Sequence, residues 1–277
     1  MTVLLFTVIL LAGAYCAGLL GSLTGLGGGV VVIPLLTLCF NVDFHYAIGA
    51  ALVASIATSS GSASAYVKEG ITNIRLGMFL EIATTIGAVC GAFIALWMPT
   101  NTIAVIFGLV LMFTAIMQQR RTADHTGVVG SELARKLKLY GTYPTKEGVQ
   151  SYQLTHVCGG FSIMVSAGIL SGLLGIGSGV LKVLAMDGAM KVPFKVSTTT
   201  SNFMIGVTAV ASAVVYIQRG YIEPGIAFPI MIGVLCGALT GTHLLKRLNV
   251  KVLRQIFAVA ILLVALNMIY DGFMGKF

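Results

Sequence analysis

Apolar segments of roughly bilayer length recur along the whole chain. A run of about 20 apolar residues crosses the roughly 30 Å hydrocarbon core of a membrane as a helix. So many such runs would aggregate in water, so lipid is the solvent that this sequence requires. We predict long helices at 2–22, 44–67, 73–98, 101–118, 152–174, 195–217, 224–245 and 250–271.

Composition supports the same class. Only 9% of the 277 residues are charged, whereas soluble domains carry about a quarter. The first 20 residues lack a basic leader, which predicts a retained helix. The net charge of +8 comes without a basic face interleaved with aromatics, so nucleic acid is not an expected partner. The five cysteines lie in apolar segments without CxxC spacing, so we expect no metal and no cofactor.

Glycines interrupt the first apolar run and then interrupt another one. "GLGGGVV" begins at Gly25, and "GIGSGVL" begins at Gly175. "AYVKEGI" (65–71) returns as "VYIQRGY" (215–221), and "GAVCGA" (87–92) returns as "GVLCGA" (233–238). Each glycine break precedes a short apolar helix, at about 30–40 and 180–190. The order of the matches predicts a duplicated half, at 1–118 and 152–277, joined by a polar linker at 119–151.

Positive charge indicates the path of each broken helix, because Lys and Arg near helix ends prefer the cytoplasm. If each break is a hairpin, all 17 Lys and Arg except Lys182, Arg219 and Lys276 lie on the side of the central linker. If each break is one bent crossing, Lys191, Lys195 and the basic residues of 246–254 move to the other side. Hairpins therefore agree better with the charge distribution.

Hairpins leave three full crossings in each half, so the two halves are inverted relative to each other. We predict an all-α polytopic membrane protein with two inverted repeats, each a broken-helix hairpin plus three transmembrane helices. The linker is then cytoplasmic, and both termini face outward across the cell (inner) membrane. Within the linker, Ser131 is expected to cap a short helix, and a solvated basic linker is its simplest interpretation.

The glycine breaks are the candidate site. Glycine allows a tight turn and lets a ligand approach the backbone, and a helix N-terminus favours an anion. Two breaks facing each other near the midplane would bind a small anion; the alternative is that the glycines only allow close packing. The residues of this prediction are Gly25, Gly27, Gly28, Gly29, Gly175, Gly177, Ser178 and Gly179.

Hydroxyl side chains cluster in the helix after each short helix. They can donate hydrogen bonds to an oxyanion without the cost of a buried charge, or they can join helices. The candidates are Ser55, Ser59, Thr199, Ser201 and Asn202.

Two ionisable residues fall inside predicted membrane segments. Lys182 lies in the second short helix, where a buried cation would attract an anionic substrate unless its side chain reaches the membrane surface. Glu81 is a candidate for proton coupling, because intramembrane carboxylates are costly and usually functional. Its alternative is an ion pair with Arg75 or Lys68. His156, near a helix start, is expected at the interface.

The motif "GSLTGLGGGVVVIPLL" (21–36) resembles the TauE/SafE family of sulfite and organosulfur exporters, and "SGLLGIGSGVLKVLAM" (171–186) resembles its second copy. The resemblance implies passage of sulfite, or of sulfonates such as sulfoacetate, across the inner membrane. The second copy departs from the pattern, because Ser178 replaces a glycine and Leu184 stands at the position of Pro34.

The sequence thus predicts a secondary transporter of a small anion that works by alternating access, with a proton as candidate coupling ion. The family resemblance implies that it is an exporter. Its partners are the anion and the lipid bilayer, with a homo-oligomer as a further candidate. An anion channel and a non-transporting membrane subunit remain alternatives. An intramembrane enzyme is not expected, since HExxH and GxGD motifs do not occur.

Overall fold

The computed structural model describes residues 3–24, 27–68, 70–118, 130–145, 148–244 and 250–276. The long helices are α1 (Val3–Thr24), α3 (Phe44–Lys68), α4 (Ile74–Ala95), α5 (Thr100–Gln118), α7 (Val157–Leu174), α9 (Phe194–Gln218), α10 (Pro224–Leu244) and α11 (Val250–Phe273). The short ones are α2 (Gly29–Pro34) with the π-helical turn η1 (Leu35–Cys39), α6 (Glu132–Lys136), and α8 (Gly179–Val183) with η2 (Leu184–Ala189). One antiparallel hairpin pairs β1 (Gly141–Thr145) with β2 (Gly148–Tyr152).

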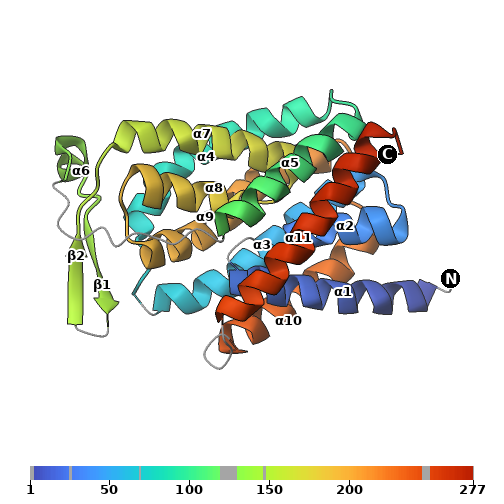
Figure 1. Ribbon diagram of the computed structural model, residues 1–277, viewed down its shortest axis with the longest axis horizontal. Coiled ribbons are helices and arrows are strands. Elements are labelled where there is room, and N and C mark those ends of the chain that lie inside the picture. The colour runs from blue at the N-terminus through green and yellow to red at the C-terminus, as the bar shows by residue number, and fades with distance from the viewer. Residues whose placement is uncertain are drawn as a thin grey trace.

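The helices form one bundle, and most of the long helices run along its long axis (Figure 1). Seven of them are long and apolar enough to span a membrane, and α11 contributes a shorter apolar stretch. Large apolar side chains such as Ile82, Phe228 and Leu263 are 58–64% exposed on the outside of the bundle, where lipid is the matching solvent. The predicted all-α polytopic membrane fold is confirmed, with the small β-hairpin as its one described exception.

Each broken helix turns back on itself. In the first half, the ring of Phe6 near the start of α1 lies 5.1 Å from that of Phe40, just after η1. In the second half, the N–H of Thr155 before α7 donates to the carbonyl of Met190 after η2 at 3.1 Å. These contacts join the beginning and the end of each segment, which is the geometry of a hairpin.

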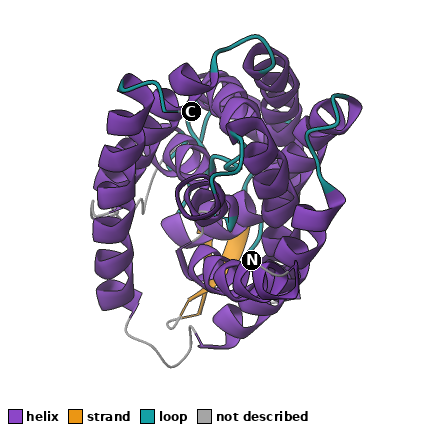
Figure 2. Cartoon of the chain, turned by 90° about the vertical axis from the view of Figure 1, so that its right-hand side faces the viewer, coloured by secondary structure: helices purple, strands orange, loops and turns teal. Residues whose placement is uncertain are grey.

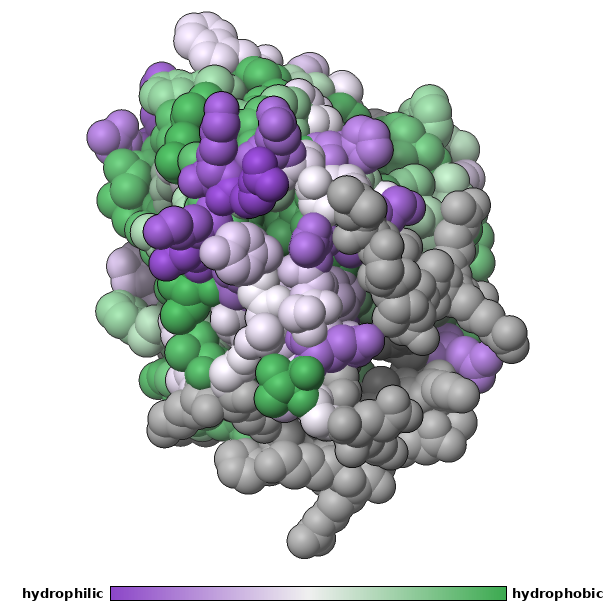
Figure 3. Space-filling model, turned by 90° about the vertical axis from the view of Figure 1, so that its left-hand side faces the viewer, coloured by the Kyte–Doolittle hydropathy of each residue, from purple (hydrophilic) through white to green (hydrophobic). Residues whose placement is uncertain are grey.

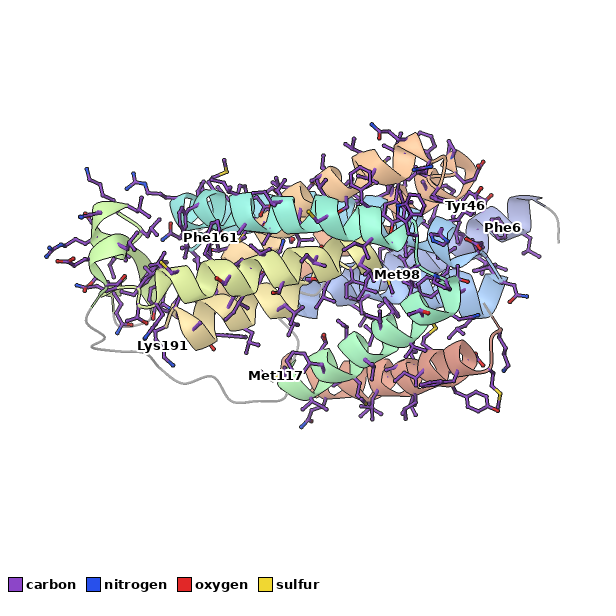
Figure 4. The ribbon with its side chains drawn as sticks, turned by 90° about the horizontal axis from the view of Figure 1, so that it is seen from above. Phe6, Tyr46, Met98, Met117, Phe161 and Lys191 are labelled. Carbon is purple, nitrogen blue, oxygen red and sulfur yellow. The ribbon has the colours of Figure 1, made fainter. Side chains whose placement is uncertain are left out.

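The two hairpins open at different ends of the molecule. Phe6 and Tyr46 lie at one end of the bundle, and Phe161 and Lys191 lie at the other (Figure 4). Both chain termini lie at the end of Phe6 and face the viewer in Figure 2. The β-hairpin lies at the end of Lys191 (Figure 1).

Glycines bring two helix pairs, α4 with α7 and α1 with α10, into backbone contact. A Cβ at Gly87 would overlap the carbonyl of Val165, and one at Gly237 would overlap that of Tyr15. The residues in these two contacts differ by 150 along the chain (237 − 87 and 165 − 15). Gly87 therefore corresponds to Gly237. The match of GAVCGA with GVLCGA pairs Gly87 with Gly233 instead, four residues away. The wrong register arose because both helices repeat glycine every four residues.

The central linker is more structured than the solvated basic linker that the sequence predicts. The Ser131 side chain accepts from the N–H of Ala134 at 3.2 Å, which confirms the predicted N-cap of α6. Buried Ala134, Leu139, Tyr152 and Leu154 join one apolar cluster with the membrane helices. Hydrophilic side chains gather over this end of the molecule (Figure 3). The described linker is thus a small domain packed on the bundle, and the β-hairpin within it was not predicted.

Candidate functional site

The first glycine break leads directly into α2. Gly27 has φ +80°, a left-handed conformation that a side chain disfavours. The N–H of Gly28 donates to the hydroxyl of Thr58 on α3 at 3.0 Å. Non-helical backbone within a membrane needs such partners inside the protein. Gly25 lies outside the described residues.

The second break has the same place in the other half but a different backbone. Gly175, Gly177 and Ser178 all have positive φ, of 68°, 68° and 47°. Ser178 carries a side chain in this region, which costs roughly 1–2 kcal/mol. Its Oγ is buried and has no hydrogen-bond partner. The residue that departs from the glycine pattern therefore stores strain and offers an unused donor.

The two breaks meet inside the bundle. A Cβ added at Gly29 would lie 2.9 Å from the carbonyl oxygen of Gly175. The hydroxyl of Ser55 donates to that same oxygen at 3.5 Å, and the hydroxyl of Ser201 donates to the carbonyl of Gly179 at 3.0 Å. A cavity of about 10 Å³ beside Ser178 has room for about one water. The described parts of the two breaks thus pack against each other, and we call this arrangement the closed conformation of the junction.

The remaining predicted hydroxyls lie beside the junction or away from it. Ser59 joins the two halves, because its hydroxyl donates to the carbonyl of Asn202 and accepts from the N–H of Gly206. Asn202 is buried at this contact. The hydroxyl of Thr199 donates to carbonyls of its own helix, at Lys195 and Val196. Among the predicted hydroxyls, Ser55 and Ser59 thus bond across the two halves, whereas Ser201 and Thr199 bond within their own half.

A buried polar cluster connects three helices next to the second break. The ammonium of Lys182 donates to the hydroxyl of Thr208 on α9, and that hydroxyl donates to Oε1 of Glu81 on α4 at 2.6 Å. Thr85 also donates to Oε1, at 3.4 Å. Lys182 is 0% exposed and Glu81 is 5% exposed. Oε2 of Glu81 is buried and has no hydrogen-bond partner.

This cluster decides two alternatives left open by the sequence. Lys182 does not reach the membrane surface, because its whole side chain is buried. Arg75 donates to the carbonyl of Lys138 at 3.2 Å and is exposed, so it is not the partner found for Glu81. The side chain of Lys68 lies outside the described residues. The two intramembrane charges therefore lie in one network.

Thr58 and Thr208 were not predicted as site residues. They occupy equivalent positions, 150 apart, and each accepts a hydrogen bond from the short helix segment of its own half. Alignment of the repeats at this constant separation would have paired them. The same alignment pairs Lys182 with Val32 and Glu81 with Met231. The charged cluster thus joins the two halves, and its repeat-related counterpart, Val32, Thr58 and Met231, carries no charge.

The described residues include no group of three or more metal-ligating side chains. The chemistry available at the junction is that of hydroxyls, backbone amides and one cation, which together suit an oxyanion.

Residues 10–268 match the model of the sulfite exporter TauE/SafE family. The chain belongs to the sulfite exporter TauE/SafE family. It is 29% identical over 278 residues to the probable membrane transporter protein YunE of Bacillus subtilis, covering 96% of this chain and 98% of that protein. It is also 25% identical over 268 residues to the probable membrane transporter protein MJ0441 of Methanocaldococcus jannaschii, covering 91% of each. No solved structure matches the chain.

Family membership and the spanning helices identify an integral, multi-pass membrane transporter. The TauE/SafE proteins matched here are named as transporters, in agreement with the expectation that the chain is not an enzyme.

Proposed function

We propose that the protein is a secondary transporter that carries a small anion such as sulfite or an organosulfonate across the inner membrane. The name of the family supports a sulfur oxyanion, and the contact of the two glycine breaks carries the proposal. Gly27, Gly28, Gly29, Gly175, Gly177, Ser178 and Gly179 would supply backbone amides to the anion.

The hydroxyls have a role in both the closed and the open junction. Ser55 and Ser201 donate to carbonyls of the second break in the closed conformation. Separation of the halves would break the hydrogen bond of Ser55, which joins α3 of one half to the second break. An oxyanion can then accept from the hydroxyls in place of those carbonyls. The same hydroxyl donors can thus bind either the carbonyls of the empty closed junction or the anion, and these two states compete.

In this proposal the halves 1–118 and 152–277 are an inverted repeat that alternates access to the junction. The linker is cytoplasmic and both termini are outside. The hairpins that open at different ends support the inversion. Export is the direction suggested by the family name, and Glu81 is the proposed proton-coupling group.

Counterflow in proteoliposomes tests the transport function. Proteoliposomes that contain the purified protein are loaded with unlabelled sulfite or methanesulfonate. They should accumulate the ³⁵S-labelled anion transiently, at a rate that saturates with its concentration. Gly177→Leu should lose this exchange, because its φ of +68° and the Ile205 side chain at 2.7 Å leave no room for a Cβ. The control Gly159→Leu adds the same bulk where the nearest side chain is 4.0 Å away. Linear flux without counterflow would indicate a channel, and no flux of either anion would contradict the proposal.

A further inference from the structure

The Lys182–Thr208–Glu81 cluster holds a cation and a carboxyl group away from water. Burying either charge alone is unfavourable, and a partner of opposite sign reduces that cost. Thr208 places the two groups within one hydrogen-bonded chain, Nζ to Oγ1 to Oε1. In the closed conformation Glu81 is therefore the counter-ion of Lys182.

The neighbouring elements supply no other cation in contact with Glu81 among the described residues. The carboxyl group faces Thr85 on its own helix, Thr208 on α9 and, through Thr208, Lys182 on α8. The other titratable side chains described on α7, η2 and α9 are Cys158, Asp187, Lys195 and Tyr216. Lys195 and Tyr216 lie 13 and 8 residues from Thr208 along α9 (208 − 195 and 216 − 208), about 20 and 12 Å along the helix. Cys158 is exposed, and Asp187 is on the segment of Lys182, five residues further along.

An anion entering beside Lys182 would change this balance. It would add a second negative charge to a site with one positive charge, and like charges in a low dielectric disfavour each other strongly. A proton on Glu81 removes the conflict. Oε2 is the atom available for it, because it has no hydrogen-bond partner. Protonation there leaves Oε1 free to keep accepting from Thr208.

We propose that Lys182 exchanges Glu81 for the transported anion, and that Glu81 binds one proton in the same step, so that anion and proton cross together. Export by this step occurs where the outward anion gradient exceeds the inward proton gradient. This inference rests on the proposed transport function. The proton comes from water on the side where the anion enters, forms the O–H bond at Oε2, and returns to water on the side where the anion leaves. Lys182 then regains the Glu81 carboxylate as its counter-ion.

The repeat-related positions predict the stoichiometry. Val32, Thr58 and Met231 stand 150 residues from Lys182, Thr208 and Glu81, and only the threonine among them is polar. One chain therefore holds one exchangeable pair, and a monoanion moves with one proton and no net charge. Met231 also provides a matched control, because Met231→Gln places the same amide at the repeat-related position, where Val32 stands in place of the lysine.

Driven accumulation in proteoliposomes tests the coupling. The probe is whichever of labelled sulfite and methanesulfonate the wild type exchanges, with protein-free liposomes correcting for passive entry. At one pH unit of gradient, acid outside, a one-to-one symporter accumulates a monoanion about tenfold. Glu81→Gln, which resembles the protonated acid, should still exchange the anion but should not accumulate it, so that the ratio of inside to outside concentration stays about one. Met231→Gln should accumulate it as the wild type does.

Lys182→Met should abolish exchange. Because this variant leaves Glu81 without its counter-ion, the double variant Lys182→Met/Glu81→Gln removes both charges and serves as the folded comparison, checked by thermal unfolding in detergent. Exchange by the double variant, or accumulation by Glu81→Gln at the wild-type ratio, would overturn the inference. In both cases exchange by the wild type would leave the proposed transport function intact, whereas its absence would refute that function itself.

Discussion

Gly29 of the first break packs directly on the carbonyl oxygen of Gly175 of the second break, so that a Cβ at Gly29 would lie 2.9 Å from that oxygen. The chain thus places its two non-helical segments in contact, although they are far apart in the sequence. The hydroxyl of Ser55, on α3, donates to the same oxygen. Any movement of one half against the other must change this contact.

Substitution of a glycine at the α4–α7 contact should destabilise the bundle. A Cβ at Gly91 would overlap the carbonyl of Ile169, and overpacking of this kind costs about 1–3 kcal/mol. We expect Gly91→Leu to lower the melting temperature in detergent. Gly159→Leu on α7 adds the same side chain without a close neighbour and should melt near the wild-type temperature. Equal losses for both variants would show that the close approach is not responsible.

Ser178→Gly should separate stability from anion affinity. Glycine adopts the φ of +47° without the strain of a side chain, but it gains more freedom in the unfolded state. The net expectation is a gain of about 0.5–1 kcal/mol in the free energy of unfolding. Loss of the unpartnered hydroxyl should raise the half-saturating anion concentration in counterflow.

Ser60→Gly is the matched comparison for that variant. Ser60 is an exposed residue in the interior of α3, so its change to glycine should cost about 0.5–1 kcal/mol. Destabilisation by both substitutions would contradict the strain assigned to Ser178.

The linker should detach from the bundle at high pH. Burial raises the pKa of Tyr152 from 10.0 to about 12, against the hydrogen bond that it accepts from Asn73. A raised pKa means that the folded state favours the neutral phenol. Its contribution is complete below pH 10 and is lost as the pH rises from 10 to 12. Hydrogen exchange of β1 and β2 should accelerate in that window.

Tyr152→Phe isolates this effect, because phenylalanine keeps the buried ring and cannot ionise. The variant should show weaker docking at neutral pH, since the side chain of Asn73 loses a partner 2.7 Å away. It should also lose the additional acceleration between pH 10 and 12. An unchanged pH profile would show that other groups control the detachment.

Single cysteines introduced into a cysteine-free background should report the orientation of the chain. We expect Gln150→Cys, in the linker hairpin, to react with an impermeant maleimide only from the cytoplasmic side. Lys276→Cys, beyond α11, should react only from outside. Both residues lie outside the helices of the bundle. Labelling of both from one side would refute the proposed topology.

Local patterns were sufficient to predict most of the fold. Each long helix that the apolar runs predict is present, and several bounds agree within a few residues, as for the expected 44–67 and the observed α3 at Phe44–Lys68. The glycine breaks and the charge distribution also predicted the hairpins. These features are properties of a continuous stretch of chain in lipid, because backbone hydrogen bonding forces each apolar run into a helix.

The β-hairpin and the equivalence of Gly87 with Gly237 required the tertiary structure. A short polar strand pair has no strong periodic signal, and helices with glycine at every fourth residue match in several registers. Contact with a specific neighbour, Val165 in one pair and Tyr15 in the other, decides between those registers.

The sequence by itself determined that Lys182 and Glu81 lie within membrane segments, and it predicted that each needs a partner. Only the tertiary structure decided that they are partners through Thr208. The three residues come from three helices, and Glu81 is 127 residues from Thr208. A buried charge needs a compensating group, but that group can come from any part of the chain that packs against it. No local sequence pattern therefore encodes which distant hydroxyl or charge becomes the partner.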